Sequence, residues 1–285
     1  MIRLDAATVL LQWATGGLLF AWVTTRRREV GIGYGWLLRA VYGVLAIGAA
    51  AAGLAVDPVA VRDLASLGVA GAAAGALAVS IVRRKAGVAG ERARKERKAA
   101  RVAAMAGAAT PAEAGEPAPV REFPPALDAV APVIGMVGLV AAGMAAGGPD
   151  ALAVARTIAG ALFLGAVSDA MLLGHWYLVQ PGLGRGPLLE LNRWLALTWP
   201  LEVGLLLWPT GMLSVLSGSV DDGWGGTLGW FWVACAVTTL VLTAVTKAAL
   251  KEKAYSAVMA ATGLLYLAIL TAFGTDLVAR LVLKS

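Results

Sequence analysis

Eight apolar segments, each close to the length that crosses a bilayer, constrain the fold of this chain more than any other feature. The hydrocarbon core of a membrane is spanned by about 20 apolar residues in a helix. We therefore expect an all-α, polytopic integral membrane protein, a bundle of eight transmembrane helices. The predicted spans are 6–24, 35–56, 59–82, 126–147, 151–179, 187–208, 224–246 and 254–277.

The overall composition supports a membrane location. Hydrophobic residues make up 59% of the chain and charged residues 15%, whereas soluble domains carry about 25% charged residues. The net charge of +6 comes from basic residues gathered between the apolar segments, where membrane orientation accounts for them, so we expect no nucleic-acid partner. Arg3 is the only basic residue before the first apolar segment, and we expect that segment to be a retained helix rather than a cleaved signal.

The basic residues also predict the orientation. They follow the first, third, fifth and seventh spans, whereas the intervening turns are acidic and poor in basic residues. By the positive-inside rule the basic loops are cytoplasmic. We therefore expect an inner (cell) membrane protein with both termini outside.

The chain divides into residues 1–82 with three spans, a cytoplasmic stretch 83–125, and residues 126–285 with five spans. Residues 91–106 are basic helix formers that we expect to continue the third span, and 107–125 are Pro-rich and read as a linker. Residues 83–101 are a candidate site for anionic lipid or an acidic partner. The alternative is that they only determine topology.

A weak internal repeat relates the two halves of the chain. At an offset of 154 residues the first two spans align with the fifth and sixth, which predicts a parallel 4+4 arrangement. The matched pairs are Leu18 with Leu172, Leu19 with Leu173, Trp22 with Trp176, Leu37 with Leu191 and Arg39 with Arg193.

Several kinds of chemistry are excluded by residue counts. Cys235 is the only cysteine and His175 the only histidine, so the chain alone forms neither an intrachain disulfide nor a zinc or bis-histidine haem site. His175 could serve as a lone axial ligand only if another subunit completed the site. No phosphate-binding loop, dinucleotide fingerprint or nucleophile elbow is present, so we expect no catalysis by this chain alone.

The densest group of polar and aromatic residues lies around the predicted fifth-to-sixth hairpin. A quinone head group needs hydrogen-bond donors for its carbonyls and an aromatic wall. The candidate set for a quinone or lipid head group is His175, Trp176, Tyr177, Arg193 and Arg39. The alternative is structural, because Trp and Tyr anchor helices at membrane interfaces and Arg can extend to the surface.

Three carboxyl groups are candidates for a proton or ion pathway: Asp169, Glu190 and Glu202. An ionisable group within a bilayer is costly and therefore a functional candidate. Asp169 is expected near the middle of the membrane, and Glu202 follows Pro200, which breaks the helical hydrogen bonding. The structural alternative pairs Glu202 with Arg156. Asp276 and Arg280, four residues apart, are expected to form a local pair.

Three functions fit these residues. The first is a cofactor-poor membrane subunit of a larger respiratory or redox complex, with a quinone or lipid site at the cytoplasmic end of the fifth and sixth spans and other membrane or peripheral subunits as partners. The second is a secondary transporter or proton-coupled carrier that uses Asp169 and Glu202. The third is a structural anchor that recruits a soluble partner.

Overall fold

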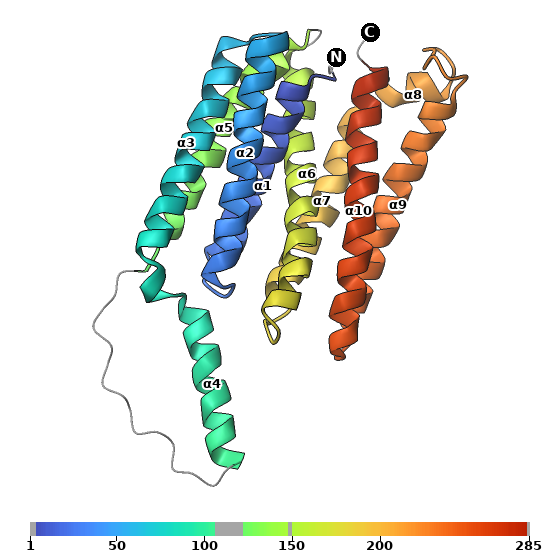
Figure 1. Ribbon diagram of the computed structural model, residues 1–285. Coiled ribbons are helices and arrows are strands. Elements are labelled where there is room, and N and C mark those ends of the chain that lie inside the picture. The colour runs from blue at the N-terminus through green and yellow to red at the C-terminus, as the bar shows by residue number, and fades with distance from the viewer. Residues whose placement is uncertain (1–3, 106–121, 148–149, 284–285) are drawn as a thin grey trace.

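A computed structural model describes residues 4–105, 122–147 and 150–283, and all regular secondary structure in this part of the chain is helical. The long helices run side by side in one bundle (Figure 1). The elements are α1 (Ala6–Thr25), α2 (Ile32–Val56), α3 (Ala60–Val82), η1 (Arg84–Ala86), α4 (Ala89–Met105), η2 (Pro125–Ala129), α5 (Val130–Ala145), α6 (Asp150–Val179), α7 (Gly186–Leu207), α8 (Gly211–Leu216), α9 (Thr227–Ala249) and α10 (Tyr255–Val282).

Seven helices of the described chain are long and apolar enough to cross a membrane, with η2 and α5 counted together as one segment. The protein is therefore a polytopic, membrane-embedded helical bundle. The eighth expected span corresponds to α7, which is 22 residues long and carries Glu190, Arg193 and Glu202. It is not among the seven, although it runs within the bundle beside α6 (Figure 1).

The two ends of the bundle differ in charge. The loops that follow α1, α3, α6 and α9 meet at one end, which we call the basic end because they carry the basic residues identified in the sequence. Both chain termini lie at the opposite end, which we call the terminal end (Figure 1). This arrangement agrees with the predicted alternation of basic and acidic loops.

The stretch 83–125 differs from the prediction at its start. Residues 91–106 were expected to continue the third span, but α3 ends at Val82, and a short η1 turn and Gly87 separate it from α4. Gly87 has a φ of 61°, a left-handed conformation that glycine adopts without steric cost. The chain therefore changes direction after α3, and α4 projects from the basic end, away from the bundle (Figure 1). The expected linker falls largely on 106–121, outside the described residues.

Each half of the chain forms a ring of four helices. In the first half α1, α2, α3 and α5 pack in a closed order, and in the second half α6, α7, α9 and α10 do the same. The halves meet mainly where α1 packs on α6. There the backbones touch, because a Cβ atom added to Gly16 would lie 1.8 Å from the carbonyl oxygen of Ala161. Small residues at this crossing give the two halves a close, side-chain-poor contact.

Candidate functional site

The three consecutive aromatic and imidazole residues of α6 do not converge. His175 is exposed, and its Nδ1 lies 3.0 Å from the hydroxyl of Tyr266 on α10. Trp176 packs instead toward α2, with its ring 6.0 Å from that of Tyr34. The buried Tyr177 donates its hydroxyl hydrogen bond to the carbonyl of Gly184 in the following loop. Successive helical residues point about 100° apart, so these side chains serve three different contacts rather than one pocket wall.

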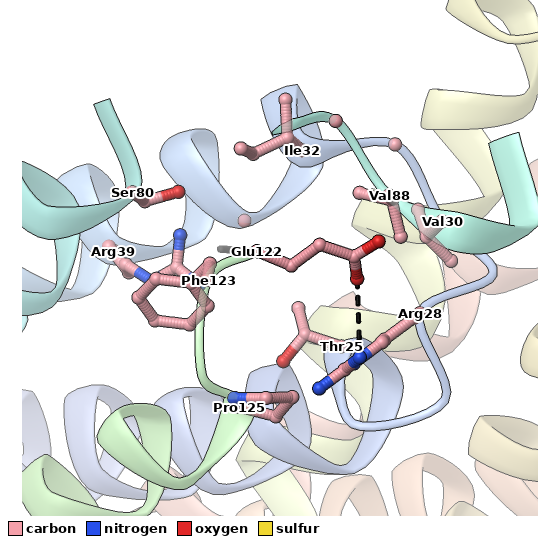
Figure 2. Close-up of a pocket in the computed structure, with 13 residues that line it drawn as sticks. Thr25, Arg28, Val30, Ile32, Arg39, Ser80, Val88, Glu122, Phe123 and Pro125 are labelled. Carbon is pink, nitrogen blue, oxygen red and sulfur yellow. Dashed lines mark hydrogen bonds and ion pairs between the residues drawn. The ribbon is translucent and has the colours of Figure 1, made fainter. Parts of the chain in front are cut away.

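Arg39 is buried and already has a protein partner. Its Nε and Nη2 each donate to a carboxylate oxygen of Asp128 at 2.7 Å, and both side chains are 3% exposed. Thr25 donates to the same carboxylate at 2.8 Å. The ring of Phe123 covers the guanidinium at 4.3 Å, as Figure 2 shows. Arg39 thus fastens the segment before α5 onto α2 at the basic end.

A second group of arginines holds the same segment from outside. Glu122 pairs with Arg28 at 3.2 Å and with Arg92 of α4, and its carbonyl accepts from Arg83 at 3.0 Å. These contacts border a small cavity of about 40 Å³ between α2 and the segment from Glu122 to Pro125 (Figure 2). Asp128 and Glu122 could not be predicted as partners of these arginines, because neither lies near them along the chain.

Arg193 lies in a different place from Arg39. It is exposed in a groove of about 800 Å³ between α7 and α9 at the basic end. Arg27 and Lys247 line the same groove, and its walls are apolar, with Leu189 and Leu197 from α7 and Leu240 from α9.

Two hydrogen bonds join the helices that form the groove. Asn192 of α7, which lines the groove, donates to the carbonyl of Thr243 of α9 at 3.1 Å, and about two turns farther from the basic end Trp199 donates to the carbonyl of Ala236 at 2.8 Å. The polar mouth and apolar walls suit an amphiphile whose head lies at the membrane surface.

Glu190 lies at the mouth of this groove rather than inside the bundle. Its carboxylate accepts from Arg26 and Arg27, both at 3.0 Å, and its side chain is 14% exposed. Arg193 and Lys247 have neither a hydrogen bond nor an ion pair within the described part of the chain. Two cations at the mouth therefore have no ion-pair partner among the residues that the structure describes.

Asp169 is fully buried in the middle of α6. One carboxylate oxygen accepts a short hydrogen bond from Tyr42, and the backbone carbonyl accepts from Tyr34 at 3.2 Å. The other carboxylate oxygen has no hydrogen-bond partner. Two tyrosines of α2 thus donate to Asp169, Tyr42 to its carboxylate and Tyr34 to its backbone carbonyl. These two partners were not predicted from the sequence.

Glu202 is also fully buried, but the expected pair with Arg156 is not formed. Arg156 donates to the backbone carbonyls of Leu205 and Trp208 at the end of α7 instead. Neither carboxylate oxygen of Glu202 has a hydrogen-bond partner. The expected pair of Asp276 and Arg280 is formed, with 2.7 Å between Oδ2 and Nε and both side chains 1% exposed. Asp276 and Arg280 act electrostatically on Glu202, so these groups are neighbours.

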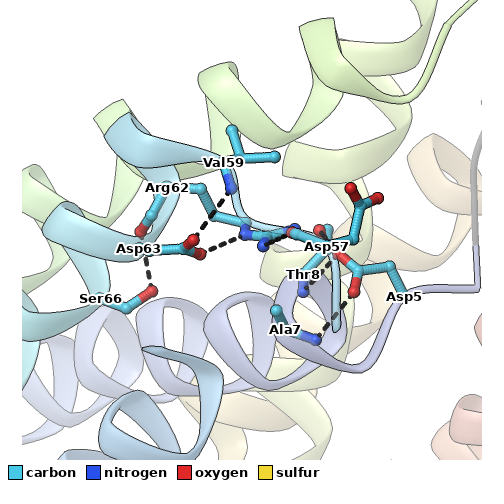
Figure 3. A network of polar contacts seen from close by, with 8 residues as sticks. All are labelled: Asp5, Ala7, Thr8, Asp57, Val59, Arg62, Asp63 and Ser66. Carbon is cyan, nitrogen blue, oxygen red and sulfur yellow. Dashed lines mark hydrogen bonds and ion pairs between the residues drawn. The ribbon is translucent and has the colours of Figure 1, made fainter. Parts of the chain in front are cut away.

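A further network at the terminal end was missed by the sequence analysis. Arg62 of α3, 2% exposed, donates to Asp63 at 2.8 Å, to Asp5 at 2.5 Å and to the carbonyl of Asp57 at 2.7 Å (Figure 3). Asp5 also caps α1 through the backbone amides of Ala7 and Thr8. The two adjacent charged residues Arg62 and Asp63 within a predicted span could have indicated a buried ion pair.

Among the described residues, no three His, Cys, Asp or Glu side chains gather as a metal site would require. No family model matches the chain, and neither the curated proteins nor the solved structures contain a match to it. The site must therefore be interpreted from its own chemistry.

Proposed function

We propose that this chain is an eight-span subunit of the inner membrane that binds an amphiphile, an anionic lipid or a quinone, in the groove between α7 and α9. The observation that carries the proposal is the groove itself, whose cationic mouth and apolar walls lie on adjacent stretches of the same two helices. An anionic head group would meet Arg193 and Lys247, and the tail would lie along Leu197 and Leu240.

The topology behind this proposal includes α7 as the eighth span. Its charged residues do not argue against a membrane location, because Glu190 and Arg193 lie at the basic end and Glu202 is enclosed by other helices. Taking the basic end as cytoplasmic puts both termini outside. The groove then faces the cytoplasmic leaflet, where anionic lipids concentrate.

A parallel 4+4 repeat is supported by the packing order. The ring α1, α2, α3, α5 and the ring α6, α7, α9, α10 have the same sequence of neighbours. Arg39 of α2 and Arg193 of α7 then occupy corresponding positions. In the first half a carboxylate of the chain fills the position opposite the guanidinium, and in the second half the corresponding position opens into the groove.

Lipid retention tests the groove directly. Each basic residue near a membrane surface contributes about 1 kcal/mol to binding an anionic lipid, so Arg193→Ala with Lys247→Ala should weaken retention about 30-fold. The assay is native mass spectrometry of protein released from nanodiscs of mixed lipid composition. Lys251→Ala with Lys253→Ala, at exposed positions in the loop after α9, removes the same charge at the basic end outside the groove and serves as the matched control. Equal loss in both variants would reject a specific groove site.

Quinone is the competing occupant, and the same preparations identify it. Extraction of a stoichiometric quinone that is lost in Arg193→Ala, with no enrichment of anionic lipid, would assign the groove to quinone. Loss on His175→Ala instead would place the quinone on the α6–α10 face and reject the groove. Copurification of redox subunits in mild detergent tests the expected respiratory assembly.

A proton-coupled carrier is the second candidate, favoured by Asp169. This carboxyl group is fully buried, contacts Tyr42 and keeps one oxygen without a partner. Asp169→Asn should abolish transport in proteoliposomes if the chain is a carrier, and should leave lipid retention in the groove unchanged. The close contact of Gly16 with α6 favours the subunit over the carrier, because it joins the two halves backbone to backbone.

A recruiting anchor is the third candidate, favoured by α4. This basic helix projects from the bundle and none of its residues is buried (Figure 1). Capture of an acidic soluble protein that is lost when Arg97 and Lys98 are changed to Ala would support this role.

A further inference from the structure

Four helices direct polar groups into one enclosed space in the half of the bundle nearer the terminal end. Gln12 of α1 is fully buried, and its Nε2 donates to the carbonyl of Thr157 on α6 at 2.6 Å. A Cβ atom added to Gly160 of α6 would lie 2.6 Å from Gln12 Nε2 and 2.7 Å from Asp276 Oδ1 of α10. The absent side chain of Gly160 thus leaves room for both groups, and Glu202 of α7 adjoins Asp276.

Several hydrogen-bond acceptors gather in this space, next to the guanidinium of Arg280, whose Nη2 would lie 3.3 Å from the same added Cβ atom. Among the described residues, Gln12 Oε1, Asp276 Oδ1 and both oxygens of Glu202 are buried without a hydrogen-bond partner. An ionised carboxylate in such a place costs several kcal/mol unless donors reach it. A proton on Glu202 would remove that charge and would also supply a donor for Asp276 or Gln12.

The charged residues around Glu202 already have other partners, so Glu202 is the carboxyl group that a proton would neutralise. Asp276 is already paired with Arg280 at 2.7 Å. Arg156 from α6 faces Glu202 as well, but its guanidinium donates to backbone carbonyls. Gln12 from α1 is neutral, and within the described residues α8 and α9 add no charged group to those acting on Glu202.

A small polar cavity lies next to these groups at the terminal end. A cavity of about 20 Å³ there is lined by Asp5, Arg62, Thr157 and Arg280, among others. A buried water needs about 10–15 Å³ and two to four polar partners, so this cavity accommodates one water molecule. Thr157 binds Gln12 and Arg280 binds Asp276, so the cavity adjoins the enclosed space.

We infer that Glu202 is a proton-binding site, protonated at neutral pH and hydrogen-bonded within the space formed by Gln12, Gly160 and Asp276, which exchanges its proton with the terminal end through water in the adjoining cavity. The step is a proton transfer only: the carboxyl O–H bond breaks toward water, and the same bond re-forms on return. The inference is independent of the α7–α9 groove, because Glu202 does not line it.

Infrared difference spectroscopy of the whole protein in nanodiscs tests this assignment. The wild type at neutral pH should show a carbonyl band of a protonated carboxyl group that shifts in D2O. Glu202→Gln should remove this band, whereas Glu96→Gln, which changes an exposed carboxylate on α4, should retain it. Asp169→Asn identifies any separate band from that carboxyl group. A band unchanged in Glu202→Gln, or loss of carboxylate absorption only, would overturn the inference.

Two further measurements keep the inference testable if one variant folds poorly. Asp276→Asn leaves Arg280 without its carboxylate beside Glu202, so the carbonyl band should be lost at a lower pH in this variant; an unchanged titration would contradict the arrangement. Glutamine is close in shape to protonated glutamate, so Glu202→Gln should keep the apparent Tm of the wild type at neutral pH. A clear fall in Tm would indicate an ionised, structurally paired Glu202 instead.

Discussion

Removing the carboxylate of Asp128 should destabilise the bundle more than any surface substitution. Asp128→Ala leaves the guanidinium of Arg39 buried at 3% exposure without the two 2.7 Å hydrogen bonds that now neutralise it. Breaking a buried ion pair from one side costs about 3–5 kcal/mol. For a chain of this size each kcal/mol corresponds to about 2–4 °C, so the apparent Tm in detergent should fall by about 10 °C.

Two further variants decide whether the reason is correct. Arg28→Ala breaks the pair with Glu122, in which Arg28 is 47% exposed; such pairs contribute about 0–1 kcal/mol, so the Tm should change by only a few degrees. Arg39→Met combined with Asp128→Leu removes both charges and should recover most of the loss. Equal Tm values for Asp128→Ala and Arg28→Ala, or no recovery in the double variant, would refute the argument from an unpaired buried charge.

Two other predictions concern the helix contacts. Gly16→Ala should sharply reduce the yield of folded protein on size-exclusion chromatography, because the added Cβ would overlap the carbonyl of Ala161, whereas Gly71→Ala, with nothing within 4 Å, should match the wild type; similar yields would contradict the close crossing. Desolvation raises the pKa of Asp222, but hydrogen bonds from the amides of Gly226, Trp224, Gly229 and Leu228 at the start of α9 outweigh it, so the pKa lies below its usual value. The ionised form therefore stabilises the fold at neutral pH and this contribution is lost as the pH falls through that lowered pKa. Asp222→Asn should lower the Tm at pH 7 but have less effect at about pH 3; an equal loss at both values would show that the charge is not responsible.

The helices could be predicted from the sequence because the membrane imposes a length and an apolar composition on each of them. The predicted span 151–179 and α6 differ by one residue at the start, and 59–82 and α3 also differ by one residue. The break at Gly87 was missed, because good helix formers lie on both sides and a single glycine is a weak signal. The close approach at Gly16 and Gly165 was missed as well, because the sequence does not distinguish these glycines from Gly71 and Gly75 of α3, which have open space beside them.

The candidate site was less predictable because chain proximity does not determine which helix a side chain meets. His175 and Tyr177 are two positions apart and therefore lie on opposite sides of α6, a separation that helical geometry alone implies. The partners of Arg39 and Arg193 depend on helices distant in sequence, so the pattern that paired these two arginines could not distinguish their surroundings. Asp276 was predicted to pair with Arg280, since that contact is local, but its position beside Glu202 depends on how α7 packs against α10.

The contrast between Arg39 and Arg193 indicates what the groove should bind. Two N–H groups of the planar Arg39 guanidinium donate to the two oxygens of Asp128. Carboxylates and phosphates can both accept such a pair of hydrogen bonds. Arg193 presents the same planar pair of N–H donors to the groove, where no carboxylate of the described residues pairs with it, because Glu190 is engaged by Arg26 and Arg27. A phosphate of an anionic lipid can occupy that position with the same two-point contact, whereas a quinone carbonyl offers one acceptor atom. The geometry of the guanidinium therefore favours a phosphate head group over a quinone at this position.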